Sequence, residues 1–346
     1  MQLIARLLLA MWLGTFVPAA ALAQPARTLG RVEPVGASGF RMEWPMSGLE
    51  ARFTGGVLTA VIEDTGNNWL NVDIDGLVTP VALSKGRKTY QLFSGAPGAH
   101  IVRVTRRTGA LAGATTFVSL TATGLTPTEA PTRRMLVIGD SISAGYGVEG
   151  ADQHCSYSTA TQNAGTAWPA LLARAYQTDL QLIAVDGRGV YRNYSGGERT
   201  MPALMQLQLP SGKTSWRGKF SAQLVIVHLG TNDFDKGDPG PNFRAAYQSL
   251  LLKVRLEQPD AEIIAAIGGM LDPEKLAMAK KAIEGAVAAR RTAGDRKVTF
   301  VYLDPPTGGR RFGCDWHPGK DAQSYMARTL QSAIEGTLGW RAAAIN

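Results

Sequence analysis

The hydrophobic patterning changes partway along the chain, and this change limits the folds that the sequence can adopt. In the first part, apolar residues recur in short, roughly alternating stretches separated by Gly, Asp-Gly or Asn-Asn. The stretches predicted to be strands are 39–44, 49–56, 57–64, 69–76, 88–95, 100–109 and 115–124. Such alternation is typical of antiparallel strands with one buried face, and no helical period accompanies it. The pattern therefore predicts a β-sandwich, jelly-roll-like domain over residues 24–128.

A different pattern follows a segment at 123–134 that contains Pro and Thr and is predicted to be a linker. Continuous apolar runs, predicted to be strands, occupy 135–139, 180–185, 224–230, 262–269 and 298–304. Helical periods lie near 167–177, 242–258, 273–293 and 320–337. Strands that are apolar along their whole length are buried on both faces, which indicates a parallel sheet covered by helices. The sequence thus predicts an α/β domain over residues 129–346, with functional groups at the carboxyl ends of its strands.

The N-terminus has the features of a secretory signal peptide. It carries one early Arg, a mostly apolar run over 7–17 and the sequence Ala21-Leu22-Ala23. A membrane anchor is the alternative, but a short run that ends in an Ala-x-Ala site favours export. We expect cleavage after Ala23 and a secreted or periplasmic protein with no later membrane span.

The charge balance argues against a nucleic-acid partner. The chain has 36 Lys and Arg residues against 28 Asp and Glu, a net charge of +8, but the basic residues are scattered. An exported protein without a base-stacking motif is a poor candidate for binding nucleic acid. The His, Cys, Asp and Glu residues also lack the spacing of a metal site, so we predict no metal.

Polar residues and glycines follow three of the predicted strands, and a histidine motif lies near the C-terminus. The segments are Gly139-Asp140-Ser141, "VDGRG" at 185–189, "HLGTND" at 228–233 and "CDWHPG" at 314–319. Each segment alone also occurs in ordinary turns. The carboxyl ends of parallel strands meet at one edge of the sheet, so together these segments indicate an active site.

The residue types at this edge suit nucleophilic catalysis. A serine hydroxyl is a weak nucleophile and needs a neighbouring base. His317 is the one histidine with a carboxylate two residues before it and a proline directly after it. We therefore predict Ser141 as the nucleophile and His317 as the general base. The other histidines, His100, His154 and His228, are predicted to be structural.

The order and spacing of these segments resemble those of the SGNH (GDSL-type) hydrolase superfamily. With the preceding β-sandwich, the motifs "VIGDSISAGYG", "DGRGVYRNY", "LGTNDF" and "GCDWHP" resemble carbohydrate esterase family 2. The resemblance implies a flavodoxin-like, three-layer SGNH domain. It also implies a cofactor-free serine esterase that removes O-acetyl groups from xylan- or mannan-type polysaccharides or oligosaccharides, often at a sugar 6-hydroxyl.

Two other functions stay open at this point. One is an SGNH esterase for a different ester, such as peptidoglycan O-acetyl groups or a short acyl lipid. The other is a carbohydrate-binding protein without activity, which the presence of Ser141, Asn232 and His317 disfavours. The oligomeric state is not predicted.

The superfamily blocks also imply roles for individual residues. The Ser141 and Gly187 backbone N–H groups and the Asn232 side-chain amide would form the oxyanion hole, with Gly189 as the alternative to Gly187. Many members place an orienting Asp three residues before the histidine, where this chain has Cys314. We expect Asp315 to complete a Ser-His-Asp triad; in some relatives a backbone carbonyl orients the imidazole instead.

Aromatic residues and cysteines lie close to these motifs. Trp316, Tyr191 and Tyr146 are candidates for a sugar-binding platform, although aromatic side chains near a site also serve as plain packing. Cys155 and Cys314 are the only two cysteines, and in an oxidising compartment such a pair predicts a disulfide bond. Two buried thiols that never pair are the alternative.

Overall fold

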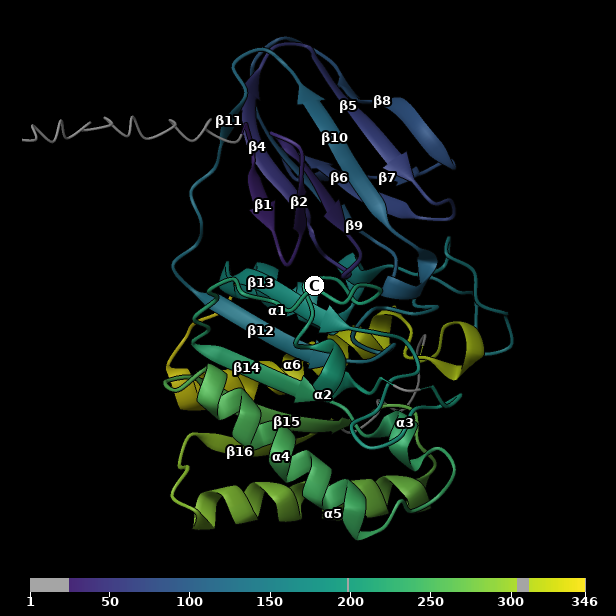
Figure 1. Cartoon of the computed structure of the whole chain (residues 1–346), viewed down its shortest axis with the longest axis vertical. Helices are drawn as coiled ribbons and strands as arrows, with labels where there is room; N and C mark the ends of the chain where they lie inside the picture. Colours follow the sequence, from purple (N-terminus) through teal and green to yellow (C-terminus); the bar gives the residue numbers. More distant parts are fainter. Residues whose placement is uncertain (1–24, 198, 304–310, 346) are drawn as a thin grey trace, which may run out of the picture.

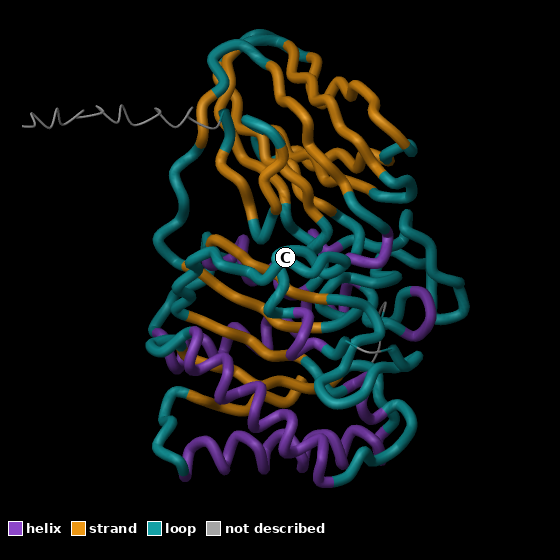
Figure 2. Tube along the Cα trace, in the orientation of Figure 1, coloured by secondary structure: helices purple, strands orange, loops and turns teal. Residues whose placement is uncertain are grey.

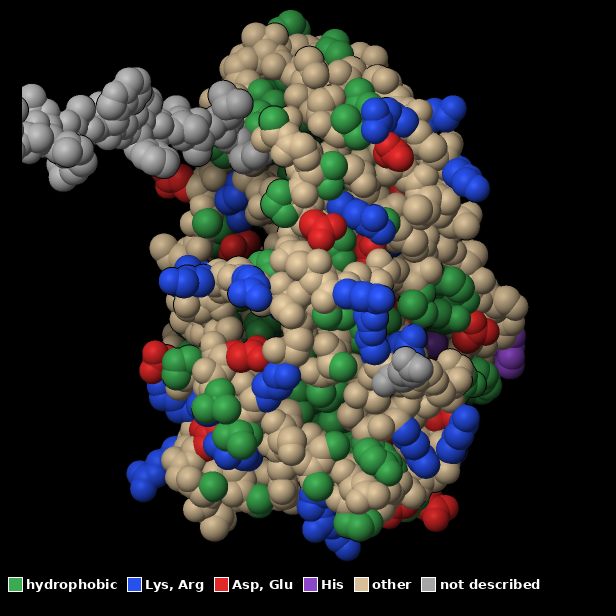
Figure 3. Space-filling model, viewed as in Figure 1, with side chains coloured by type: hydrophobic (Ala, Val, Ile, Leu, Met, Phe, Trp, Pro, Cys, Tyr) green, Lys and Arg blue, Asp and Glu red, His purple; other side chains and the backbone are tan. Residues whose placement is uncertain are grey.

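The computed structural model describes residues 25–197, 199–303 and 311–345, which form a β-rich domain stacked on an α/β domain (Figure 1). The predicted signal peptide, residues 1–23, lies outside the described residues. Within the described ranges, no helix combines the length and apolar character needed to cross a membrane. Lys and Arg side chains are scattered over the face in Figure 3, with Asp and Glu among them.

The first domain is the predicted β-sandwich. One sheet has the order β1-β4-β9-β6-β7, with β11 beside β4, and the other has the order β2-β3-β10-β5-β8. The strands are β1 (Arg27–Leu29), β2 (Glu33–Val35), β3 (Gly39–Met42), β4 (Gly48–Thr54), β5 (Val57–Asp64), β6 (Trp69–Ile74), β7 (Leu77–Ala82), β8 (Gly86–Ser94), β9 (Ala99–Arg106), β10 (Thr115–Thr121) and β11 (Thr126–Pro127). Alternate residues such as Leu58, Ala60 and Ile62 of β5 point into the core, as the alternation predicts.

Four strands of this domain were not predicted. β11 lies inside the segment predicted to be a linker, where Thr126 and Pro127 pair with β4. β7 is an edge strand that contains Pro80, and a proline within a run weakens the strand signal. β1 and β2 have three residues each, too few for alternation to show.

The second domain is built on a five-stranded parallel sheet with the order β13-β12-β14-β15-β16. The strands are β12 (Arg134–Gly139), β13 (Asp179–Ala184), β14 (Leu224–His228), β15 (Glu262–Gly268) and β16 (Val298–Leu303). The helices are α1 (Trp168–Tyr176), α2 (Met201–Leu204), α3 (Thr231–Phe234), α4 (Pro241–Glu257), α5 (Pro273–Thr292) and α6 (Lys320–Leu338). Short 3₁₀ turns are η1 (Ala110–Ala112), η2 (Ala164–Thr166) and η3 (Cys314–Trp316). All five predicted strands and all four predicted helices of this domain are confirmed.

Helices cover both faces of the parallel sheet, as the continuously apolar strands predict (Figure 2). Residues of α4 and α5 pack on one face, where Tyr247 and Ile283 meet Val225 and Val227 of β14 in one core. Residues of α1 and α6 pack on the other face in a second core. At the start of α5, the Asp272 side chain accepts a hydrogen bond from the Lys275 N–H at 3.0 Å, ahead of proline at the first helical position.

The strand order determines where a site can form. β12 comes first in the chain but lies between β13 and β14, so the order reverses at β12. Connections on the two sides of this reversal leave the sheet in opposite directions, which opens a crevice at the carboxyl ends of the strands. The segments that begin at Asp140, Val185 and Leu229 follow these three neighbouring strands and therefore meet at this crevice.

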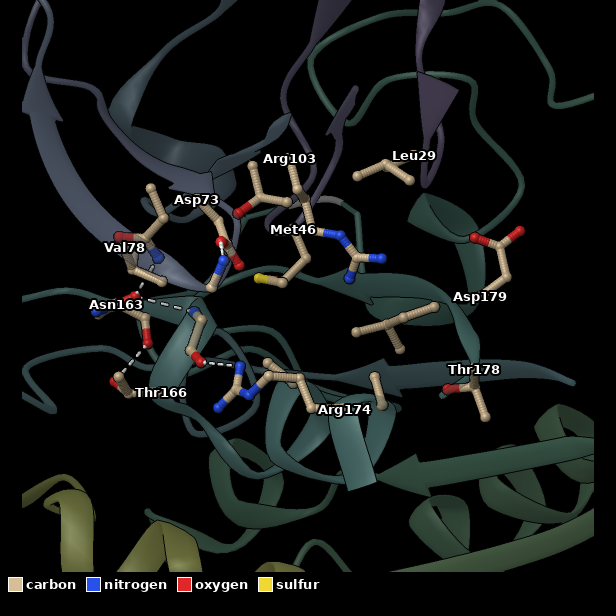
Figure 4. Close-up of a pocket in the computed structure, with 17 residues that line it drawn as sticks. Leu29, Met46, Asp73, Val78, Arg103, Asn163, Thr166, Arg174, Thr178 and Asp179 are labelled. Atoms are coloured by element: carbon tan, nitrogen blue, oxygen red, sulfur yellow. Dashed lines mark hydrogen bonds between the residues drawn. The ribbon is translucent and has the colours of Figure 1, made fainter. Parts of the chain in front are cut away.

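Polar contacts join the two domains. The Arg27 side chain bonds to Asp179 at 3.1 Å, and the Asn71 amide donates to the Asn163 side-chain oxygen at 2.8 Å. Between them lies a cavity of about 420 Å³, lined partly by Arg103 and Arg174 (Figure 4). The cavity reaches the start of β13, at the end of the sheet opposite the crevice, so it is separate from the site described next.

Candidate active site

Ser141 and His317 form a hydrogen-bonded pair at the carboxyl edge of the parallel sheet. His317 Nε2 lies 2.9 Å from Ser141 Oγ, although 176 residues separate them in the chain. Ser141 follows β12 by two residues, and His317 directly follows η3. The two residues predicted to be nucleophile and base are therefore brought together at a distance that permits proton transfer.

The other ring nitrogen of His317 faces a main-chain carbonyl. Nδ1 lies 3.1 Å from the carbonyl oxygen of Asp315. A carbonyl oxygen only accepts hydrogen bonds, so Nδ1 carries the proton in the neutral ring. Nε2 is then free to accept the Ser141 hydroxyl proton, which is the tautomer that a general base requires.

The Asp315 carboxylate points elsewhere, and in this the structure differs from the expected triad. Its Oδ2 accepts hydrogen bonds from the Tyr146 hydroxyl at 3.2 Å and from the Tyr157 N–H at 3.0 Å. Asp315 and Trp316 both have left-handed backbone conformations, with φ of 51° and 61°. This tight turn directs the carbonyl of Asp315, rather than its carboxylate, toward Nδ1.

Burial determines the charge of His317. Removal from water disfavours the imidazolium and lowers the pKa of His317 to about 4, although the carbonyl and the carboxylate of Asp315 oppose the shift. The ring is therefore neutral at pH 7 and ready to accept a proton.

The structure distinguishes between the two candidate glycines for the oxyanion hole. The Gly189 N–H donates to the Asn193 side-chain oxygen at 3.1 Å and is thus occupied. Gly187 has a φ of +73°, a conformation that favours glycine, and its carbonyl accepts the Tyr194 N–H at 2.9 Å. No hydrogen bond from the Gly187 N–H to another described residue appears, which leaves this donor for a ligand.

The Asn232 side chain connects the loops that follow β12 and β13. Its Nδ2 donates to the Arg188 carbonyl oxygen at 3.0 Å and to Asp140 Oδ2 at 3.2 Å. Asn232 itself lies in α3, the short helix after β14. The three predicted oxyanion donors therefore come from the ends of three adjacent strands. Both hydrogens of the Asn232 amide are engaged in these two bonds, so this amide reaches a substrate oxygen only by giving up one of them, and the bond to Asp140 is the longer.

Two buried carboxyl groups, Asp140 and Asp186, directly precede Ser141 and Gly187 in the chain. Burial raises the pKa of Asp140 to about 8 and that of Asp186 to about 6. A neutral Asp140 places less negative charge near a developing oxyanion. Asp233, whose pKa burial also raises, accepts the N–H groups of residues 190, 191 and 192 and so holds the loop after β13.

The aromatic residues near the site divide into two groups. Trp316 and Tyr191 are exposed, 53% and 43%, and stay candidates for contact with a sugar. Tyr146 is not free to stack on a sugar, because Tyr157 and His317 lie on its ring at 4.0 and 4.1 Å. Tyr194, which was not predicted to contact a sugar, is 55% exposed and lies beside Gly187.

A disulfide joins Cys155 to Cys314, as predicted. It links the loop after Ser141 to η3, the turn that carries His317. Gly150 packs against the bond so closely that a Cβ there would lie 2.4 and 2.5 Å from the two sulfur atoms. The Asp315 N–H also donates to the Cys155 carbonyl oxygen at 3.1 Å. These contacts hold the histidine turn against the serine loop.

The other histidines lie outside this pair. His100 bonds to Asp75 in the sandwich, His154 contacts the Trp316 ring, and His228 is buried in β14. In the part of the chain that the structure describes, no group of three or more His, Cys, Asp and Glu side chains has the arrangement of a metal site.

Comparison with known proteins agrees with this geometry. The model of the GDSL-like lipase/acylhydrolase family matches residues 137–324, and that of the carbohydrate esterase 2 N-terminal domain matches residues 28–131. The chain is 31% identical over 321 residues to a cellulase/esterase, CelE, of Acetivibrio thermocellus, covering 90% of this chain but only 39% of the length of that relative. It is 28% identical to an acetylxylan esterase/glucomannan deacetylase of Cellvibrio japonicus, covering 86% and 84% of the two chains.

A solved structure extends the likeness to both domains. A family two carbohydrate esterase from Clostridium thermocellum, in complex with cellohexaose, is 30% identical, with a TM-score of 0.88 over 91% of this chain and 99% of that one. Fold and matches together define a carboxylic ester hydrolase of the GDSL-like lipase/acylhydrolase type. Within that class, the chain belongs to carbohydrate esterase family 2.

Proposed function

We propose that the chain removes O-acetyl groups from a xylan- or mannan-type polysaccharide or oligosaccharide through an acyl-enzyme. The observation that carries this proposal is the 2.9 Å contact between His317 Nε2 and Ser141 Oγ. The name of the Cellvibrio relative and the cellohexaose bound to the Clostridium structure support an acetylated carbohydrate as the substrate.

In the proposed mechanism, His317 Nε2 takes the Ser141 hydroxyl proton as Oγ attacks the acetyl carbonyl carbon. The Ser141 and Gly187 N–H groups donate to the negatively charged carbonyl oxygen, and the Asn232 amide joins them by exchanging its 3.2 Å bond to Asp140 for one to this oxygen. The bond to the sugar oxygen then breaks, and His317 returns the proton to that oxygen. Water, deprotonated by His317, attacks the acetyl-enzyme and releases acetate.

In the proposed mechanism, the main-chain carbonyl of Asp315, rather than its carboxylate, orients the His317 ring. A carbonyl oxygen determines the tautomer as well as a carboxylate does, but it contributes less negative charge toward the imidazolium that forms. The machinery is therefore a Ser-His dyad with a main-chain third member.

Acetate release is the test. The purified protein is incubated with acetylated xylan, acetylated glucomannan, O-acetylated peptidoglycan and a short-chain triacylglycerol. We expect release from the two plant-type polysaccharides, and NMR of the residual acetyl groups identifies the position attacked. Ser141→Ala is the control and should lower kcat by about 10⁴–10⁶. If acetate or acid is released only from peptidoglycan or only from the lipid, that ester is the substrate and the proposed polysaccharide substrate is wrong.

A serine-directed organophosphonate tests for catalytic competence. We expect one label per chain on Ser141 and none in Ser141→Ala. A carbohydrate-binding protein without activity would bind the polysaccharides but take up no label.

We also propose that residues 1–23 direct export and are removed after Ala23. The Cys155–Cys314 disulfide supports this proposal, because such bonds persist in oxidising compartments. Sequencing the N-terminus of the protein recovered from the secreting cells should give Gln24 as the first residue.

A further inference from the structure

Three aromatic rings lie in a stack behind the proposed catalytic pair. Tyr146 lies 4.1 Å from the His317 ring, at 30° to its plane, and 4.0 Å from the Tyr157 ring, at 17°. Two rings this close to a third and nearly parallel to it must occupy its opposite faces. Tyr146 is therefore sandwiched between Tyr157 and the imidazole.

The edge of the stack is held by one carboxylate. Asp315 Oδ2 accepts from the Tyr146 hydroxyl and from the Tyr157 N–H, at 3.2 and 3.0 Å. The Tyr157 hydroxyl donates to Gln162 at 2.7 Å. At its other end, the Tyr146 N–H bonds to the Ser141 carbonyl at 3.0 Å. Tyr146 is thus fixed both to the serine loop and to the histidine turn.

We propose that Tyr146 is a positioning residue for His317, whose ring face seats the imidazole and stabilises the positive charge that His317 gains from the Ser141 proton. The Asp315 carboxylate serves this role indirectly, by holding the Tyr146 ring. The inference rests on the proposed function, because it assigns His317 the role of base.

The physical basis is the electron-rich face of the aromatic ring. A cation within about 6 Å of such a face is attracted to it, and the attraction grows when water is excluded. When Nε2 takes the proton, the imidazolium finds a carbonyl at Nδ1 and the Tyr146 ring against its plane. In a triad a carboxylate at Nδ1 would supply this stabilisation. Here the face of the Tyr146 ring supplies part of this stabilisation of the imidazolium.

The charged side chains of Asp315, Asp186 and Arg106 act on the stack. The Asp315 carboxylate favours the protonated form of His317, and burial opposes it. Burial is the main cause that raises the pKa of Tyr146 and of Tyr157 far above the usual range. Asp315 and Asp186 add to the shift of Tyr146, whereas Asp186 adds to that of Tyr157 and Arg106 opposes it. Both hydroxyls therefore stay protonated, so the ring faces act on His317 as neutral groups.

The experiment varies the electron density of the ring while keeping its shape. Tyr146→Phe removes only the hydroxyl and should keep kcat within about fivefold, since one hydrogen bond is lost. Replacing that Phe by analogues with one, two and three fluorine atoms withdraws charge from the face step by step. We expect log kcat to fall steadily along the series, with KM nearly unchanged, and Tyr146→Leu to lose about 10–30-fold in kcat.

The acid limb of the kcat/KM profile separates the electrostatic role from packing. Loss of the ring face should move this limb to lower pH in Tyr146→Leu, because the imidazolium loses a favourable partner. A purely packing role would instead admit water and move the limb up toward the usual histidine value. The inference is overturned if the acid limb of Tyr146→Leu moves to higher pH, or if kcat stays constant along the fluorinated series.

Two controls make either outcome interpretable. Tyr176→Leu removes a tyrosine that packs on Trp340 at 5.6 Å, at the far end of the sheet, and should alter neither kcat nor the pH profile. Thermal unfolding checks that each Tyr146 variant is folded. Ser141→Ala tests the proposed function separately: if that variant stays active the function fails, whereas an inactive variant with a flat fluorine series rejects only the role of Tyr146.

Discussion

The main-chain carbonyl of Asp315 lies 3.1 Å from His317 Nδ1, while the carboxylate of the same residue binds Tyr146 and Tyr157. One residue thus orients the imidazole with its backbone and holds the neighbouring ring with its side chain. The separation of these two roles leads to the first prediction.

Asp315→Asn should lower kcat by less than about tenfold. The substitution keeps the carbonyl at Nδ1, and asparagine tolerates the left-handed conformation with φ of 51°. Its side-chain oxygen can still accept one of the two hydrogen bonds. The measurement is kcat on acetylated xylan at neutral pH.

A much larger effect would contradict this assignment. If the carboxylate itself fixed the tautomer, the loss would approach about 10⁴. Glu274→Gln, at an exposed residue on the first turn of α5, is a control for the loss of one carboxylate away from the site.

The acid limb of kcat/KM should lie well below the ordinary pKa of histidine, near pH 4, because burial lowers the pKa of His317 to about 4. The neutral base exists above this pKa, so activity is retained from neutral pH down to about pH 5 and is lost below it. Initial rates with acetylated xylan in a constant-ionic-strength buffer series provide the profile. A half-maximal point near pH 6.5 would show that His317 is solvated in the working enzyme.

Asn232→Ala should lower kcat by about 10²–10³ and change KM little. The amide would act on the oxyanion, which forms only near the transition state. Because Asn232 also bonds to Asp140 and to the Arg188 carbonyl, the thermal midpoint must be measured beside the kinetics. A rise in KM with unchanged kcat would place Asn232 in substrate binding instead.

The Cys155→Ser, Cys314→Ser double variant should have both a lower melting temperature and a lower kcat. The bond closes a loop of 159 residues, and chain-entropy reasoning assigns about 5 kcal/mol to so long a loop, a value that depends on the model used. Because the bond also ties the His317 turn to the serine loop, its loss should loosen the base.

Gly150→Ala is a companion test that leaves both cysteines in place. Its Cβ would collide with both sulfur atoms, so we expect a displaced loop and a reduced kcat. Thiol titration of the denatured, unreduced wild type should find no free thiol. Two free thiols per chain would show that the disulfide does not form. A double variant with wild-type kcat would show that the disulfide stabilises the fold but does not affect catalysis.

The sequence was sufficient for much of the fold. Strands such as β12 and β14, whose residues are all or nearly all buried, give continuous apolar runs, and the amphipathic helices between them have an unambiguous period. Short or proline-containing edge strands such as β7 bury too little to leave a pattern, and they were missed. The spacing of apolar residues reflects which side chains are buried, so strands that bury few side chains cannot be found from it.

The proposed nucleophile and base could also be found from the sequence, because Ser141 lies at a strand end and His317 is held in a motif with neighbouring Asp and Pro. The choice between Gly187 and Gly189 could not be made from the sequence, because it depends on which of the two N–H groups donates a hydrogen bond to the Asn193 side chain. Likewise, the sequence made Tyr146 a candidate for sugar contact, but in the structure the Tyr157 and His317 rings cover both of its faces.

The sequence by itself thus determined which residue types stand at the carboxyl ends of the strands, and only the tertiary structure decided which of their atoms face one another. The reason is geometric. Strand position follows from burial, which the pattern of apolar residues records along the chain. The group that meets His317 Nδ1 depends instead on two left-handed residues, at 315 and 316, and on a disulfide across 159 residues, which turn a carbonyl inward and its carboxylate toward Tyr146.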